Sequence, residues 1–130
     1  MSVEFGYAIV YVPSVPEAIE FYEAAFEFED SFIHESEDYG ELATGNTKLA
    51  FTSHDLAAKS VPFSYQAVDE ADQSPGVEFT LTTDDVDTAW RRAVDAGATS
   101  LQKPHDAPWG QRVAYVKDCF GFPVGIATPM

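Results

Sequence analysis

Two stretches of alternating apolar and polar residues, each followed by a helical pattern, recur about 71 residues apart along this chain of 130 residues. Residues 5–12 alternate and are rich in β-forming side chains, which predicts a strand. Ser14, with Glu17 three residues later, predicts a helix that begins with a capping box. Apolar side chains at helical spacing then continue to about Phe26, where we expect this helix to end.

The second half of the chain repeats this unit. When the sequence is shifted, Glu78–Trp90 lies over Tyr7–Ile19 as a strand, a helix cap and a helix. Asp85 takes the capping position, and Gly97 marks the expected end of the second helix. A duplicated unit of this length predicts two similar modules that bury a common core.

Each module is expected to add three successive strands after its helix. In the first module they are residues 32–35, about 39–44 and about 47–53, and in the second they are residues 99–103, 111–117 and 122–127. We therefore predict a single domain, residues 1–130, built of module 1 (about 4–53), a linker (54–76) and module 2 (about 77–128).

Charge and composition narrow the classes of partner. The formal net charge is −15 with only seven Lys and Arg residues, which argues against nucleic acid and anionic membranes as partners. The acidity is typical of a protein kept soluble by charge, and it also suits a cationic partner. Cys119 is the single cysteine, so no internal disulfide framework is possible. No apolar run reaches membrane-spanning length and the start lacks signal-peptide features, which favours a cytoplasmic protein.

Four segments together resemble the vicinal oxygen chelate superfamily, which includes glyoxalase I, extradiol dioxygenases, fosfomycin-resistance enzymes and bleomycin-binding proteins. They are Val12–Tyr22, Thr83–Trp90, Asp95–Ala98 and Lys103–Gly121, and the resemblance spans residues 5–128. It implies an α+β fold of two βαβββ modules that form a curved, open eight-stranded sheet. It further implies helices on the convex side, a pocket in the concavity and, because such proteins are commonly dimers, a homodimer.

In metal-dependent members of that superfamily, the first and last strands of each module supply the metal ligands. By alignment these positions are Tyr7, Ala50, Glu78 and Gly125. A transition metal needs about three or four donors from His, Asp, Glu or Cys. Ala50 and Gly125 offer none and neutral Tyr7 is a poor one, so we expect no metal and no other cofactor.

The same strand alternation directs a mixed set of polar and aromatic side chains into the concavity. We expect the ligand to be bound by Tyr7, Tyr11, His34, Lys48, Ala50, Thr80, Trp109 and Gly125. The linker residues Phe63 and Tyr65 are further aromatic candidates. A concave His34 would contact the ligand or pair with Glu78. His54, expected at the end of a strand, and His105, expected in a loop, are interpreted as surface histidines or as histidines satisfied by local hydrogen bonds.

Glu78 is the tentative catalytic residue. If buried near Tyr7 and Thr80, its carboxyl would have a raised pKa and would serve as a general base or as a hydrogen-bonding anchor. Alternatively, it is a solvated residue at the mouth of the pocket.

Two functions follow from these expectations. The first is a metal-free binding protein for a small organic molecule, for which an acidic protein with an aromatic cleft favours a basic compound. The alternative is an enzyme of the superfamily, of lyase or dioxygenase type, with a rebuilt metal site or with Glu78 as general base.

Overall fold

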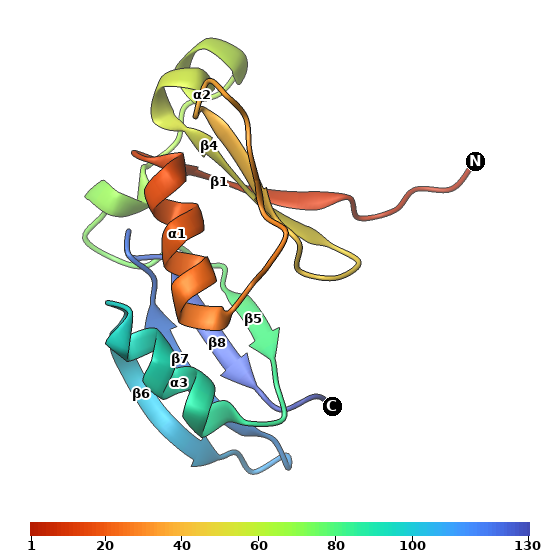
Figure 1. The fold of residues 1–130 in the computed structure, drawn as a ribbon, viewed down its shortest axis with the longest axis vertical. Coiled ribbons are helices and arrows are strands. Elements are labelled where there is room, and N and C mark those ends of the chain that lie inside the picture. The colour runs from red at the N-terminus through yellow and green to blue at the C-terminus, as the bar shows by residue number, and fades with distance from the viewer.

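The protein, described over all 130 residues by a computed structural model, consists of two modules with the same element order (Figure 1). Module 1 contains β1 (Tyr7–Val12), α1 (Val15–Phe26), β2 (Phe32–Ile33), β3 (Tyr39–Leu42) and β4 (Lys48–Ser53). Module 2 contains β5 (Phe79–Thr82), α3 (Val86–Asp95), β6 (Thr99–Asp106), β7 (Arg112–Lys117) and β8 (Pro123–Ala127). The predicted α+β class and the two βαβββ modules are confirmed.

The strands form two four-stranded sheets with matching topology. Sheet A has the order β1-β4-β3-β2 and sheet B the order β5-β8-β7-β6, and the first and last strands of each module pair in parallel. The open, eight-stranded surface is thus built of two hydrogen-bonded units, with β1 and β5 as edge strands. Helices α1 and α3 lie on one side, and the opposite faces of both sheets are left open (Figure 1).

Local capping explains where the two long helices begin. The Ser14 hydroxyl accepts the backbone N–H of Glu17 at 3.3 Å, and the Asp85 carboxylate accepts that of Thr88 at 3.1 Å. Each bond satisfies one of the N–H groups that a helix leaves unpaired in its first turn. At the other end of α1, Glu27 adopts a left-handed conformation with φ 60° and closes the helix. No helix in the protein combines the length and the apolar character needed to span a membrane.

The linker is more ordered than expected, because it contains α2 (His54–Ser60) and a short 3₁₀ helix, η1 (Val68–Glu70). Ser53 ends β4 and also caps α2, since its hydroxyl accepts the backbone N–H of Leu56 at 3.1 Å. His54 is therefore the first residue of a helix and does not lie in a strand.

Two strands end at places other than those predicted. β2 stops at Ile33, because the ring of His34 accepts the backbone N–H of Ser36 and turns the chain there. β6 continues to Asp106, with irregular register against β7, so that His105 lies opposite Val113 within a strand and not in a loop. Both corrections change the position of a histidine.

The larger of two hydrophobic clusters, with 19 buried residues, joins the two modules. It combines the buried face of α1 with side chains from both sheets, such as Phe51 of β4 and Ile126 of β8. Within it, the hydroxyl of the fully buried Tyr22 donates to Asp118, in the turn between β7 and β8, at 2.6 Å. Asp118 also accepts the backbone N–H groups of Phe120 and Phe122 at 2.9 Å. This carboxylate therefore ties α1 of module 1 to a turn of module 2.

Replacing Tyr22 with Phe is expected to lower the free energy of unfolding by about 2 kcal/mol, because the buried carboxylate of Asp118 loses a donor while the ring is retained. Urea unfolding followed by circular dichroism measures the change. Tyr39→Phe is the matched control, because its hydroxyl bonds a less buried carboxylate within module 1, and we expect it to cost less than about 1 kcal/mol. Equal losses in the two variants would contradict the role of Tyr22 in joining the modules.

Candidate functional site

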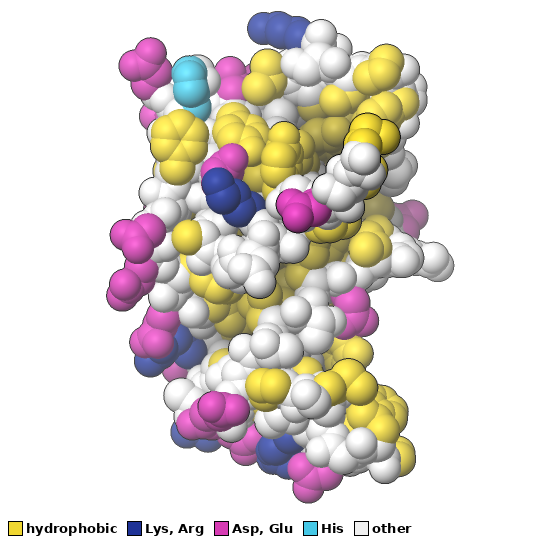
Figure 2. All heavy atoms as spheres, turned by 90° about the vertical axis from the view of Figure 1, so that its right-hand side faces the viewer, with side chains coloured by type: hydrophobic (Ala, Val, Ile, Leu, Met, Phe, Trp, Pro, Cys, Tyr) yellow, Lys and Arg dark blue, Asp and Glu magenta, His cyan; other side chains and the backbone are white.

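Alternation separates a more exposed face from a more buried one along β1, β3 and β5, as predicted, whereas β4 and β8 are buried along nearly their whole lengths. In β1, Tyr7 is 54 % exposed and Ile9 41 % exposed, whereas Val10 and Val12 are buried against the core. Figure 2 shows hydrophobic side chains gathered over the middle of the open side of the molecule. Large apolar groups left in water at such density are typical of a surface that binds something.

On sheet B, the open face brings together Glu78, Thr80, Tyr115 and Gly125. Thr80 pairs with Gly125, which in turn pairs with Tyr115, so the three lie in one row across β5, β8 and β7. The Thr80 hydroxyl donates to the Glu78 carboxylate at 2.7 Å. A Cβ atom on Gly125 would lie only 2.6 Å from Glu78 Oε2 and 3.2 Å from Thr80 Oγ1. The Glu78 carboxylate therefore occupies the space that a side chain at position 125 would need.

A pocket of about 470 Å³ opens beside this row. Thr80, Tyr115 and Gly125 line it, together with Trp109 and Gln111 from the β6–β7 connection. The Trp109 indole N–H donates to Gln111 Oε1 at 2.7 Å, and the Gln111 amide donates to the backbone carbonyl of Thr128 at 2.7 Å. These two bonds hold the indole in place although the residue is 66 % exposed. A fixed, exposed aromatic ring is suited to stacking on a flat ligand.

Glu78 is exposed, so of the two alternatives drawn from the sequence the structure has the solvated carboxylate and not the buried one. The residue immediately precedes β5, where the chain is still leaving the linker, so water reaches its side chain. Its charge nevertheless acts on a neighbour. Burial, and then the Glu78 carboxylate, raise the pKa of Tyr115 above its ordinary value.

On sheet A, the expected residues Tyr7 and Lys48 are exposed on the open face, whereas Ala50 is fully buried. The polar contacts on this face centre on Glu41. Its carboxylate accepts from the Tyr39 hydroxyl at 2.7 Å and pairs with the Lys48 ammonium at 3.2 Å. These hydrogen bonds, that of Tyr39 first, lower the pKa of Glu41. Sequence reasoning missed Glu41 and Tyr39. The signal that could have found Glu41 was its register opposite Ala50.

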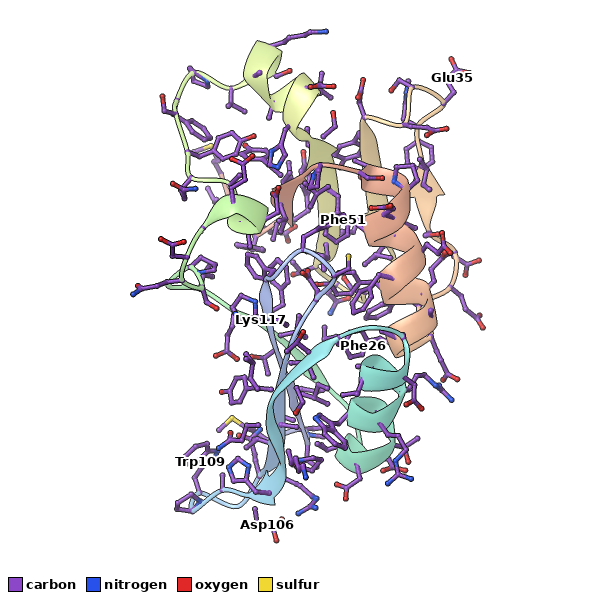
Figure 3. All side chains as sticks on the ribbon, turned by 90° about the vertical axis from the view of Figure 1, so that its left-hand side faces the viewer. Phe26, Glu35, Phe51, Asp106, Trp109 and Lys117 are labelled. Carbon is purple, nitrogen blue, oxygen red and sulfur yellow. The ribbon has the colours of Figure 1, made fainter.

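The two remaining candidates lie elsewhere. Tyr11 packs in an aromatic cluster with the linker residues Phe63 and Tyr65, whose ring centroids lie 6.4 and 4.7 Å from its own. His34 lies in the β2–β3 turn, where its ring bonds Ser36 and does not pair with Glu78. Figure 3 shows its neighbour Glu35 at the opposite end of the molecule from Trp109.

The four positions aligned with metal ligands do not fit a metal ion. Tyr7 and Ala50 stand on sheet A, Glu78 and Gly125 on sheet B, and one carboxylate is the only strong donor among them. No group of three or more His, Cys, Asp or Glu side chains anywhere in the chain is arranged to hold a metal. The donor set therefore falls short of the three or four ligands that a transition metal requires.

Comparison with known proteins gives a consistent answer on family and fold. Residues 4–126 match the model of the Glyoxalase/Bleomycin resistance protein/Dioxygenase superfamily. Among curated proteins, none matches the sequence.

Similar solved structures include a glyoxalase-related enzyme from Fulvimarina pelagi, with a TM-score of 0.82 and 16% identity over 97% of this chain and 88% of that one. A superfamily enzyme from Burkholderia phytofirmans PsJN has a TM-score of 0.70 and 20% identity over 98% of this chain and 100% of its own. A superfamily member from Sphaerobacter thermophilus DSM 20745 has a TM-score of 0.70 and 21% identity over 98% of each chain. Identities this low establish a shared fold and no more.

Replacing Glu78 with Gln is expected to lower the pKa of Tyr115, because a nearby negative charge disfavours the phenolate and the amide carries none. The pKa should stay above that of a free tyrosine, since burial is the larger cause. NMR titration of ¹³C-labelled tyrosine rings measures the shift, with Tyr115→Phe to assign the signal. Tyr39, which bonds Glu41 on sheet A, is the internal control and should not change. An unaltered Tyr115 titration would show that the Glu78 carboxylate does not act on this phenol.

Proposed function

The chain belongs to the Glyoxalase/Bleomycin resistance protein/Dioxygenase superfamily, and from this membership we propose that it is a metal-free member that binds a small organic molecule on the open face of sheet B. One observation carries the proposal. Position 125, where metal-dependent members would place a ligand, is a glycine whose missing side chain makes room for the Glu78 carboxylate. The site thus has the space and the polarity of a binding pocket but one strong metal donor.

A flat, positively charged compound suits this pocket best. Trp109 presents an aromatic ring held by Gln111, and Glu78 supplies an accessible carboxylate close to Thr80 and Tyr115. Stacking and cation–π contact with the indole favour a planar cation. The net charge of −15 adds a long-range attraction for a basic ligand and repels anionic ones.

Acid–base catalysis is the second candidate function, and the contact between Glu78 and Tyr115 favours it. A carboxylate that is open to solvent and lies beside a phenol of raised pKa can accept a proton from a bound substrate while the phenol donates one. In this candidate Glu78 is the general base, as in the enzyme alternative drawn from the sequence. Turnover of a bound compound that is lost in Glu78→Gln would distinguish it from binding alone.

The binding proposal is tested with N-methylquinolinium and its neutral isostere 1-methylnaphthalene, measured by isothermal titration calorimetry. We expect the cation to bind more tightly, and Glu78→Gln to weaken cation binding about threefold to fivefold, as for an exposed charge pair. Trp109→Ala should weaken both probes, because both stack on the indole. Added sodium chloride should reduce only the preference for the cation.

Two controls accompany this experiment. Lys48→Met changes a charge on sheet A and should leave both affinities unchanged. Added Zn²⁺, Mn²⁺ or Fe²⁺ should alter neither the affinities nor the melting temperature. Metal-dependent turnover, or a metal-induced rise in melting temperature that Glu78→Gln abolishes, would overturn the metal-free proposal.

We also propose that the protein is a homodimer whose interface includes the N-terminal side of β1. Phe5 is 72 % exposed directly before this edge strand, and Val3 and Tyr7 add apolar surface at alternate positions. An open strand edge with apolar side chains is a ready surface for a second copy.

Sedimentation velocity at micromolar concentration is expected to show a dimer that is stabilised by salt, because each chain carries a charge of −15. Phe5→Asp should produce a monomer. Leu101→Asp, an equally charged change at an exposed apolar residue of β6, should leave the dimer intact. A monomeric wild-type protein at physiological salt would refute the dimer.

A further inference from the structure

A second cavity lies where the two modules and the linker meet. Its volume is about 280 Å³, and nine of its ten lining residues are hydrophobic. β1 supplies one side from Ala8 to Tyr11, and module 2 supplies Phe79 and Phe122. The rings of these two phenylalanines stack with centroids 4.3 Å apart. This junction cavity shares no lining residue with the pocket on sheet B.

The linker contributes Tyr65, Gln66 and Val68 to the lining. The position of Tyr65 is set by contacts on both sides. Its ring centroid lies 4.7 Å from that of Tyr11. Its hydroxyl lies 2.7 Å from His54 Nδ1, and His54 Nε2 lies 2.9 Å from a carboxylate oxygen of Asp69. The start of α2, the linker and η1 thus hold one phenol through a chain of two hydrogen bonds.

The hydrogen bonds between Asp69 and His54 and between His54 and Tyr65 determine which hydrogen-bonding role is left to the Tyr65 hydroxyl. The Asp69 carboxylate can only accept, so His54 donates from Nε2. When the imidazole is neutral, Nδ1 accepts and the hydroxyl of Tyr65 is the donor. The phenol oxygen keeps its lone pairs for a further partner. Burial, followed by the fields of Tyr11, Asp69 and Glu70, raises the pKa of Tyr65 and keeps it a neutral phenol.

We propose that the junction cavity is a second binding site, separate from the pocket on sheet B, for a small, flat, apolar molecule that carries one hydrogen-bond donor. Tyr65 accepts that hydrogen bond. His54 and Asp69 are positioning residues, which act by holding the phenol and its proton. The volume lies near the lower limit of ligand pockets and restricts the occupant to about one or two fused aromatic rings.

The test compares indole with 1-benzofuran, which has the same shape but no N–H. Calorimetric titration of the full-length protein should give a dissociation constant for indole below about 1 mM and an affinity for indole about threefold to tenfold above that for benzofuran, the worth of one hydrogen bond. Tyr65→Phe keeps the aromatic wall, so benzofuran affinity should stay the same while the preference for indole is lost. Tyr39→Phe removes a phenol from sheet A and should change neither value.

Further measurements locate the probe and separate this site from the proposed one. Phe122→Trp should fill the cavity and weaken both compounds, and indole should shift the backbone amide signals of Val77 and Phe79 in NMR spectra. N-methylquinolinium, the probe of the pocket on sheet B, should not displace indole. Absence of indole binding, equal affinity for indole and benzofuran, a preference that survives in Tyr65→Phe, or displacement by the quinolinium probe would each overturn the second site. The first three of these results do not depend on whether the pocket on sheet B binds its own ligand.

Discussion

The hydrogen bond between Tyr22 and Asp118 links the two repeated modules inside the core that they share. The residues are 96 positions apart, and the bond lies inside a core to which both modules contribute. A four-stranded sheet with one helix cannot bury its apolar face alone, so each module depends on the other for a dry interior. Asp118 tolerates burial because Tyr22 and the backbone of its own turn donate to it. With both long helices packed into this core, the opposite faces of the sheets stay uncovered by helices.

Those open faces are chemically different although their backbones match. On sheet A, Glu41 is engaged by Tyr39 and Lys48, so its charge is satisfied within the protein. On sheet B, the Glu78 carboxylate receives a hydroxyl from Thr80 and remains exposed. The duplication therefore supplied two similar sheets whose side chains differ, so that one carboxylate is paired within the protein and the other stays exposed to solvent.

The features that were predictable from sequence are those encoded by neighbouring residues. The starts of the two long helices could be predicted because each capping residue, Ser14 or Asp85, bonds a backbone N–H only three positions further along the chain. Helix α2 was not predicted, because it is short and its capping residue, Ser53, also ends a strand. The position of Glu41 opposite Ala50 and the contact of the Glu78 carboxylate with Gly125 could not be predicted in this way. Both depend on strand register, which brings together residues far apart in the sequence. The exposure of Glu78 depends on the point at which the chain leaves the linker and enters β5, and no local sequence pattern specifies that point.

The close packing of Glu78 on Gly125 also limits how this protein could change over generations. An acidic residue introduced at position 125 would meet the existing carboxylate at van der Waals distance or closer, and two like charges in contact disfavour each other. Relieving the clash by replacing Glu78 would remove the only strong donor already present. A metal-binding site at these positions is therefore separated from the present sequence by coupled substitutions, each unfavourable by itself. Gly125 therefore favours retention of the present arrangement, because no single substitution at position 125 or at Glu78 leads to a metal site.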